Sequence, residues 1–186
     1  MATRLPTRRF TVDEYYRMAD AGILGAQERV ELIEGEIIQM AAIGSRHSGV
    51  VKRLNRLFSR GLGDAVLVQV QDPVRLSDLS EPEPDIALLR PKPDDYTGAH
   101  PGPADTLLIV EVADATVGFD RGIKAPLYAV SGISEYWLVD IAAETIEVYR
   151  DPGPTGYREV SKHRRGCVLH PLAFPDFDVP VDAILP

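Results

Sequence analysis

The sequence predicts an α/β protein whose mixed β-sheet is flanked by helices. Two apolar segments, 84–89 and 107–112, have the length of buried strands, and helix-spaced apolar residues occur before and after them. Apart from Glu111, the second segment is apolar throughout, which is typical of a strand buried on both faces. No repeat or linker divides the 186 residues, so we expect a single domain over residues 1–186.

The composition is that of an ordinary globular protein, with 45% apolar and 26% charged residues. No apolar run approaches the ~20 residues that span a bilayer, and the first six residues lack the apolar stretch of a signal peptide. We therefore expect a cytoplasmic protein with no membrane partner. Cys167, the single cysteine, cannot form an internal disulfide and is expected to be a small buried residue.

The net charge of -8 argues against broad, nonspecific binding of nucleic acid, which depends largely on neutralised phosphates. Two local basic clusters stand against this trend, at 46–60 and at Lys162-His163-Arg164-Arg165. Each is as readily a solvated face that binds nothing as a nucleic-acid surface.

The N-terminal part contains a predicted helix and a predicted hairpin. Thr11 and Glu14 have the spacing of a capping box, so a helix is expected to run from there to about Ala21. Residues 30–33 and 36–40 form two strands joined by Glu34-Gly35, where glycine supplies the positive φ of a tight turn.

A second helix is predicted from Ser45 or Arg46, with Gly61 ending it. Helical spacing buries an apolar face made of Val50, Val51, Leu54, Leu57 and Phe58. The exposed face is basic and consists of Lys52, Arg53, Arg56 and Arg60.

The rest of the chain alternates strands, loops and one short helix. We expect an extended stretch at 65–76, a polar loop at 91–105, a helix at about 120–130, and strands at 135–140, 145–150 and 157–160. The tail after residue 170 is rich in proline and is predicted to lie over the body in extended form.

The two apolar segments carry one acid each, Asp85 and Glu111. Folding the segments antiparallel about the loop between them gives the register Asp85 opposite Glu111, Ala87 opposite Ile109 and Leu89 opposite Leu107. Directly opposed carboxylates, with Cβ atoms roughly 5 Å apart, destabilise a sheet unless something offsets their repulsion. A divalent cation bound by both acids does so, and oxygen ligands favour Mg²⁺ or Mn²⁺ over Zn²⁺.

A hydrolytic metal site also needs a positive group, and Lys124 is the candidate. A helix that begins at 122–123 uses Pro126 in its first turn and holds Lys124 beside its positive end. A lysine there can orient an attacking water and stabilise charge on a phosphate. The alternative is a surface lysine paired with Asp120, four residues earlier.

These residues belong to an ordered set over roughly residues 11–150. The set comprises Glu31-Leu32-Ile33-Glu34-Gly35-Glu36, His47, Pro84-Asp85, Glu111-Val112 followed by Thr116, Asp120 with Lys124 and Tyr128, and Gly132-Ile133-Ser134-Glu135-Tyr136-Trp137-Leu138-Val139-Asp140. Pro84-Asp85 with Glu111-Val112 resembles the PD-(D/E)XK nuclease motif. The ordered set resembles one branch of that superfamily, a bacterial family of putative restriction endonucleases of unassigned function.

The resemblance implies a restriction-endonuclease-like core in which Asp85 and Glu111 hold the metal, with the carbonyl of Val112 as a third ligand. The chain departs from the superfamily pattern at Ala113, where a lysine is expected and where serine is common in this branch. Lys124 is then the residue that takes the role of that lysine.

Two further residues are candidates for catalysis. Glu31 stands where an additional acid could approach the metal, although Glu34 and Glu36 compete with it and a solvated hairpin charge is an equal alternative. His47, at the start of the basic helix, could contact a phosphate or the attacking water, or could make an ordinary hydrogen bond at a helix end.

The sequence therefore predicts a metal-dependent phosphodiesterase of the nuclease type that acts on DNA, with Mg²⁺ or Mn²⁺ activating water. Tyr136 and Trp137 are interpreted as residues of the core or of a homodimer interface, not as base-stacking groups. The alternative is a catalytically silent nuclease-like module that binds DNA or a protein, and the net charge of -8 keeps this alternative open. The presence of Asp85, Glu111 and Lys124 argues against that alternative.

Overall fold

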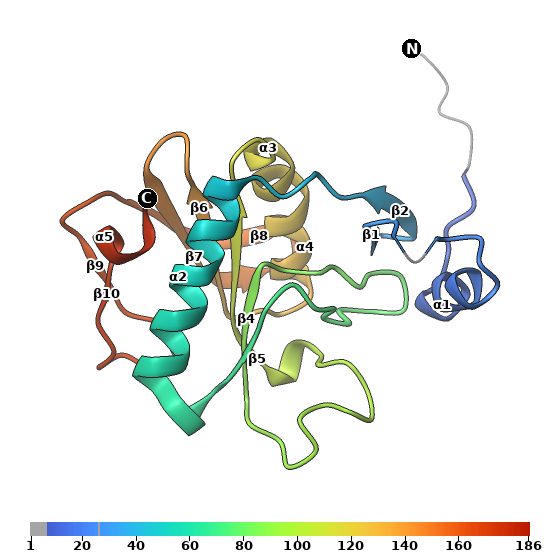
Figure 1. Ribbon diagram of the computed structural model, residues 1–186, viewed down its shortest axis with the longest axis horizontal. Coiled ribbons are helices and arrows are strands. Elements are labelled where there is room, and N and C mark those ends of the chain that lie inside the picture. The colour runs from blue at the N-terminus through green and yellow to red at the C-terminus, as the bar shows by residue number, and fades with distance from the viewer. Residues whose placement is uncertain (1–6, 26) are drawn as a thin grey trace.

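Six strands form the central sheet, in the order β3-β4-β5-β6-β7-β8 (Figure 1). The structure, a computed structural model, describes residues 7–25 and 27–186. The strands are β3 (Leu67–Gln69), β4 (Ile86–Leu89), β5 (Thr106–Ala113), β6 (Glu135–Asp140), β7 (Thr145–Gly153) and β8 (Gly156–His163). Neighbouring strands are antiparallel except β5 and β6, which are parallel. The predicted mixed sheet is confirmed.

A helical crossover joins the parallel strands β5 and β6, as this pairing requires. It consists of α3 (Val117–Phe119), a π-helical turn η3 (Asp120–Lys124) and α4 (Ala125–Val130). Because this helical segment begins at Val117, Lys124 lies in its interior. The prediction that Lys124 sits beside a helix start was wrong. Pro126 has no N–H to complete an α-helical bond, and the π turn immediately precedes it.

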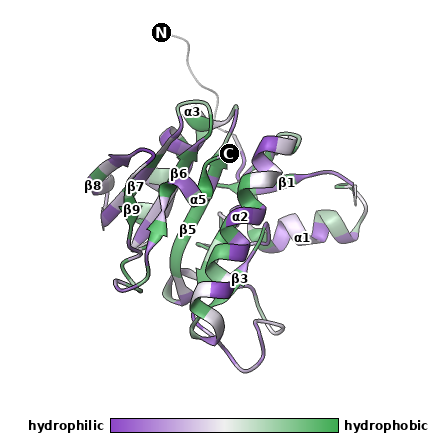
Figure 2. Cartoon of the chain, turned by 60° about the vertical axis from the view of Figure 1, so that its left-hand side comes forward, coloured by the Kyte–Doolittle hydropathy of each residue, from purple (hydrophilic) through white to green (hydrophobic). Residues whose placement is uncertain are grey.

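The two faces of the sheet carry separate apolar cores. Along β5 the side chains alternate, so that Val110 faces α2 (Ser45–Leu62) while Ile109 faces α4. The alternation of green and purple along α2 in Figure 2 reflects its one buried apolar face. Tyr136 and Trp137 are fully buried, one on each side, so their interpretation as core residues is confirmed.

Helix α2 follows the prediction closely. It buries Val50, Val51, Leu54 and Phe58, whereas Leu57 remains partly exposed. Gly61 does not end the helix, which continues to Leu62, and Gly63 follows it with a positive φ of 51°, which glycine adopts without strain.

The register of β4 and β5 agrees with the prediction on the side near Asp85. Ala87 pairs with Ile109 as expected, but Leu89 pairs with Thr106 and not with Leu107. A β-bulge between Leu88 and Leu89 accounts for the shift, since it places an extra residue on one strand. The bulge lies at the far end of β4, so it leaves the position of Asp85 unaffected.

The N-terminal elements lie to one side of the sheet (Figure 1). They are α1 (Val12–Asp20), which Thr11 and Glu14 cap as predicted, and the hairpin of β1 (Val30–Ile33) and β2 (Glu36–Gln39). Glu34 and Gly35 both have positive φ, as a type I′ turn requires. A Cβ at Gly35 would lie 2.5 Å from Cβ of Arg9, so this position also requires glycine for space.

The C-terminal tail is more ordered than the sequence predicted. It contains β9 (Val168–Leu169), β10 (Val179–Pro180) and α5 (Val181–Ile184). Val179, Val181 and Ile184 are fully buried in the α2-side core, and the burial of these apolar groups offsets the cost of ordering the tail. Cys167 is only partly buried.

Two 3₁₀ turns, η1 (Gly63–Ala65) and η2 (Pro103–Asp105), complete the secondary structure of the described residues. The expected extended stretch at 65–76 contains regular strand only in β3. In the part of the chain that the structure describes, no helix is both long and apolar enough to cross a membrane.

Candidate functional site

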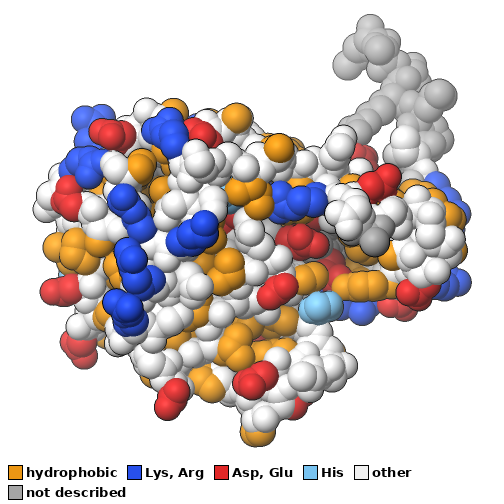
Figure 3. Space-filling model, viewed as in Figure 1, with side chains coloured by type: hydrophobic (Ala, Val, Ile, Leu, Met, Phe, Trp, Pro, Cys, Tyr) orange, Lys and Arg blue, Asp and Glu red, His pale blue; other side chains and the backbone are white. Residues whose placement is uncertain are grey.

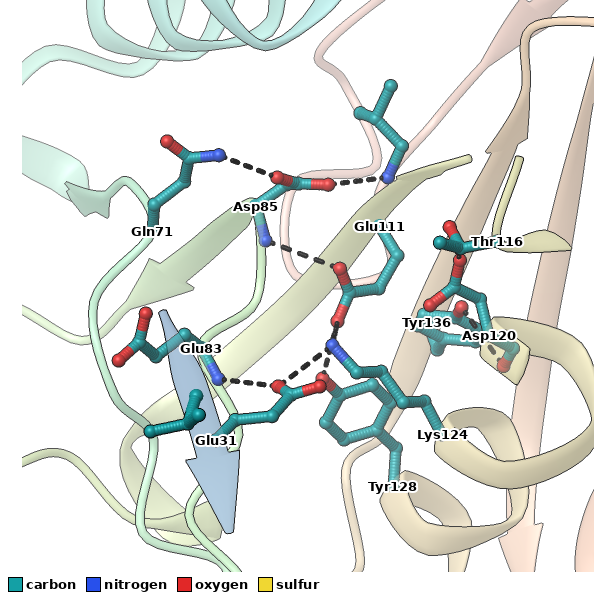
Figure 4. Close-up of polar contacts among 12 residues, drawn as sticks. Glu31, Gln71, Glu83, Asp85, Glu111, Thr116, Asp120, Lys124, Tyr128 and Tyr136 are labelled. Atoms are coloured by element: carbon teal, nitrogen blue, oxygen red, sulfur yellow. Dashed lines mark hydrogen bonds and ion pairs between the residues drawn. The ribbon is translucent and has the colours of Figure 1, made fainter. Parts of the chain in front are cut away.

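A cleft of about 400 Å³ opens between the start of α2, the β1–β2 hairpin and the crossover helix after β5. Its lining contains all five side chains that the sequence singled out as catalytic candidates: Glu31, His47, Asp85, Glu111 and Lys124. The fold thus brings together residues spread over 94 positions of the chain (124 − 31 + 1). Figure 4 shows most of them with their polar contacts.

Asp85 lies just before β4 and is 7% exposed. Its Oδ2 accepts the backbone N–H of Val112 at 2.9 Å and lies 2.9 Å from Nε2 of His47. Its Oδ1 accepts a hydrogen bond from the amide of Gln71 at 3.0 Å. The N–H of Val112 thus holds Asp85 directly, while the role of the Val112 carbonyl as a ligand stays a prediction.

Glu111, on β5, turns its carboxylate toward the crossover helix (Figure 4). Its Oε1 accepts hydrogen bonds from Nζ of Lys124 at 3.0 Å and from the hydroxyl of Tyr128 at 2.7 Å, and its Oε2 accepts the N–H of Asp85 at 3.4 Å. Burial raises the pKa of Glu111 to about 8, an effect that Lys124 opposes and Asp85 reinforces. The repulsion between the opposed acids is therefore offset in part by donors of the chain itself.

Lys124 is buried and carries two ion pairs. Its Nζ lies 3.0 Å from Oε2 of Glu31 and 3.0 Å from Oε1 of Glu111. Although burial disfavours the ammonium, these two carboxylates raise the pKa of Lys124 above its usual value. The alternative of an exposed lysine paired with Asp120 was wrong. Asp120 is itself buried and accepts the hydroxyl of Thr116 at 2.6 Å.

Glu31 is the acid of the hairpin that reaches this site. It is 3% exposed, and its Oε2 accepts the backbone N–H of Glu83 at 3.2 Å as well as binding Lys124. Glu34 and Glu36 are exposed, so neither replaces it. The bridge between Leu32 and Glu81 explains this placement, because it docks β1 against the segment that leads into Asp85.

His47 occupies the first turn of α2, and its Nε2 lies next to Oδ2 of Asp85. The hydrogen bond with Asp85 raises the pKa of His47, and burial acts in the opposite direction. Its Nδ1 is buried and has no hydrogen-bond partner within residues 7–25 and 27–186. The partner of His47 is thus Asp85, itself a candidate metal ligand, and the role of His47 in catalysis stays a prediction.

Three further residues belong to the site: Gln71, Asp120 and Tyr128. The sequence assigned no role to Gln71 or Tyr128 and named Asp120 only as an alternative partner of Lys124. For Asp120 and Tyr128 a signal existed, because spacings of four residues on either side of Lys124 place all three near one helix face. Gln71 has a left-handed φ of 53°, and nothing in its sequence context marks it.

The chemistry of the lining fits a hard divalent cation. Six acids line the cleft (Glu31, Glu83, Asp85, Glu111, Asp114 and Asp120), against one lysine and one arginine. Among the described residues, no group of three or more His, Cys, Asp and Glu side chains is arranged to hold a metal. A cation at Asp85 and Glu111 therefore needs backbone or water oxygens as its other ligands, which is usual for Mg²⁺.

The two predicted basic clusters differ in how free their charges are. Exposed Lys52, Arg56 and Arg60 lie on α2, and Figure 3 shows Lys and Arg side chains gathered on that side of the molecule. In the second cluster, Lys162 pairs with Glu147 at 2.9 Å and Arg165 with Asp182 at 3.5 Å. The α2 face is therefore the better candidate for binding phosphates.

The protein is of the mixed α/β class, with a six-stranded sheet and the acids Asp85 and Glu111 at one cleft. A solved structure of a "putative nuclease" from Anabaena variabilis has the same fold, with a TM-score of 0.72, 16% identity, and coverage of 94% of this chain and 97% of the other. The chain belongs to the Uma2 family, described as "putative restriction endonuclease", whose model matches residues 12–182. An uncharacterized protein of Synechocystis sp. is 28% identical over 153 residues, which cover 79% of this chain and 84% of that protein.

Proposed function

We propose that this protein hydrolyses phosphodiester bonds of DNA, with Mg²⁺ or Mn²⁺ held by Asp85 and Glu111. The observation that carries the proposal is the placement of Lys124, whose ammonium is fixed between Glu31 and Glu111 at the wall of the cleft that Asp85 also lines. A buried lysine and a buried glutamate in one cleft, Lys124 and Glu111, both with a pKa raised above its usual value, are typical of a functional site.

Each residue of the site has a distinct role in this proposal. A bound cation lowers the pKa of water and polarises a phosphoryl oxygen. Lys124 remains protonated and stabilises negative charge that develops on the phosphate, while Glu31 fixes its position. His47 lines the same cleft with its Nε2 2.9 Å from Oδ2 of Asp85, and in this proposal it orients Asp85 or contacts the attacking water or a phosphate oxygen.

The DNA backbone would run from the cleft toward the basic face of α2. Lys52, Arg56 and Arg60 are exposed there, and His47 begins the same helix. Such contacts neutralise phosphates without reading sequence. They also offset the repulsion between DNA and a chain whose net charge is -8.

A second candidate function is a nuclease-like module without catalysis that binds DNA or another protein. The arrangement that favours it is the saturation of Glu111 Oε1 by Lys124 and Tyr128, which stabilises the acids without any cation. The two functions differ in whether cleavage accompanies binding.

The test is cleavage of supercoiled plasmid and of single-stranded circular DNA with Mg²⁺ or Mn²⁺, by wild type, Asp85→Asn and Lys162→Ala. Lys162 pairs with Glu147 outside the cleft and serves as the matched control. We expect wild type and Lys162→Ala to cleave and Asp85→Asn to be inactive. DNA binding by all three without cleavage supports the silent module, and equal cleavage by Asp85→Asn contradicts the proposed site.

A further inference from the structure

The two oxygens of Glu111 have unequal environments. Oε1 accepts the hydroxyl of Tyr128 at 2.7 Å and the ammonium of Lys124 at 3.0 Å. Oε2 accepts the backbone N–H of Asp85 at the longer distance of 3.4 Å. An ionised carboxylate offers about four lone-pair sites, so two close donors fill one of its oxygens. Oε2 is therefore the oxygen that keeps capacity for a further partner.

The surroundings of Tyr128 fix its hydroxyl next to Oε1 of Glu111. It lies on α4, is fully buried, and packs its ring against Tyr136 with 5.2 Å between ring centroids. In Figure 4 its hydroxyl meets Glu111 from the side of α4, beside the ammonium of Lys124.

We propose that Tyr128 is a positioning residue that occupies Oε1 of Glu111 and leaves Oε2 as the single oxygen of this carboxylate that binds a cation. The inference rests on the proposed function, because it takes Glu111 to be a metal ligand. Its consequence is selectivity. Mg²⁺ requires near-octahedral geometry with separate oxygen ligands, whereas Ca²⁺ readily accepts a carboxylate through both oxygens. Tyr128 thereby favours Mg²⁺ and Mn²⁺ over Ca²⁺.

The variant that tests this role is Tyr128→Phe, which removes the hydroxyl and retains the ring. Tyr136→Phe is the matched control, since the Tyr136 hydroxyl contacts the backbone carbonyl of Asp120 at 3.5 Å and not Glu111. Dissociation constants for Mn²⁺ and for Ca²⁺ are measured by calorimetry on the full chain, with the melting temperature recorded without metal.

We expect Tyr128→Phe to weaken Mn²⁺ binding by about 10-fold or more, the usual scale for losing a group that orients a metal ligand. Ca²⁺ binding should weaken less, so the dissociation constant for Mn²⁺ should rise relative to that for Ca²⁺. A purely structural role for Tyr128 weakens both cations equally, and that result overturns the inference. Tyr136→Phe should retain the wild-type ratio.

A second measurement uses the wild-type protein and does not depend on the folding of any variant. Infrared spectra of protein with isotope-labelled glutamate, with and without Mn²⁺, distinguish one-oxygen from two-oxygen binding by the spacing of the carboxylate stretches. We expect one-oxygen binding, and a two-oxygen signature overturns the inference. If wild type binds no Mn²⁺, the proposed function fails together with this inference. If wild type binds Mn²⁺ and Tyr128→Phe matches it, the role of Tyr128 alone fails.

Discussion

Two buried glutamates of the central sheet, Glu111 on β5 and Glu147 on β7, have opposite electrostatic environments. Glu111 is 4% exposed and Glu147 is 5% exposed, so burial alone does not distinguish them. Burial raises the pKa of Glu111 to about 8. At Glu147 burial acts in the same direction, but hydrogen bonds from Arg121 and Lys162 outweigh it and lower the pKa to about 2.

The difference lies in the cations. Glu147 has two of them, Arg121 and Lys162, at 2.9 Å each, and their side chains are 43% and 47% exposed. Glu111 shares Lys124, whose side chain is 5% exposed, with Glu31. Water solvates the two cations at Glu147 and lowers the desolvation cost of that ion pair. At the other site one buried ammonium serves both Glu31 and Glu111, so the negative charge there is only partly compensated. We therefore interpret Glu147 as part of a structural ion pair and Glu111 as part of the proposed functional site.

The largest effect expected from this comparison is on turnover. Lys124→Ala should reduce the rate of DNA cleavage by about 10²-fold or more, the scale for removing one electrostatic stabiliser of a transition state, while Mn²⁺ binding stays intact or tightens slightly. Lys124→Arg should restore activity in part at best, because a planar guanidinium does not reproduce a compact ammonium.

The matched substitution at the other glutamate is Lys162→Ala, which removes a cation from Glu147. It should leave the rate of cleavage near that of wild type. Wild-type turnover by Lys124→Ala would show that Lys124 has only a structural role. The positive group of the site would then have to be His47 or an arginine of α2.

The next effect concerns stabilisation by metal. If Asp85 and Glu111 bind Mn²⁺, the melting temperature should rise with Mn²⁺ concentration, corresponding to about 2.7 kcal/mol at 100 times the dissociation constant. Asp85→Asn should abolish the rise, and Glu147→Gln should retain it. A melting response that persists in Asp85→Asn at full size contradicts the site.

The two glutamates should also show opposite pH dependence in the free energy of unfolding without metal. The folded state raises the pKa of Glu111, so its contribution favours folding when the group is protonated and declines as the pH rises from about 4.5 to about 8. The folded state lowers the pKa of Glu147, so its contribution is complete above about 4.5 and is lost as the pH falls toward 2.

Denaturant unfolding of Glu111→Gln and Glu147→Gln tests this contrast. At pH 9, Glu111→Gln should be more stable than wild type, because the amide resembles the protonated acid. Glu147→Gln should be less stable by about 1–3 kcal/mol, since it loses charge-assisted hydrogen bonds. If the two substitutions change the free energy of unfolding equally at pH 9, the proposed electrostatic difference between Glu111 and Glu147 is contradicted.

The smallest effect is expected on the α2 surface. Changing Lys52 and Arg56 to glutamate should weaken DNA binding alike for all sequences and reduce the salt slope by about 1 for each phosphate that is no longer neutralised. Reversing exposed Arg158, which pairs with Asp151 on the β7–β8 hairpin, should have little effect. Undetectable DNA binding at low salt by wild type contradicts the assignment of DNA as substrate.

The sequence predicted the parts of the site that depend on local periodicity. Alternation in two strands was enough to place Asp85 opposite Glu111 and to pair Ala87 with Ile109. It could not predict the bulge after Leu88, because a bulge adds a residue without any change in pattern.

Contacts between distant segments were harder to predict. Spacing offered Asp120 only as an alternative partner for Lys124, whereas the fold supplies Glu31 from a hairpin about 90 residues earlier in the chain, at 3.0 Å. Because the crossover helix begins at Val117, Lys124 lies in the helix interior, where it reaches Glu111. Gln71 and the buried C-terminal residues depend on tertiary packing, which no local pattern reports.

The central claim is that the Asp85–Glu111 pair holds a divalent cation beside Lys124, and Mn²⁺-soaked crystals test it most directly. Anomalous diffraction locates manganese without assumptions about its ligands. We predict an anomalous peak bound by Asp85 and by Oε2 of Glu111, next to Lys124, that is absent from crystals of Asp85→Asn. Crystals saturated with Mn²⁺ that show no peak in this cleft, or a peak retained there in Asp85→Asn, would contradict the account.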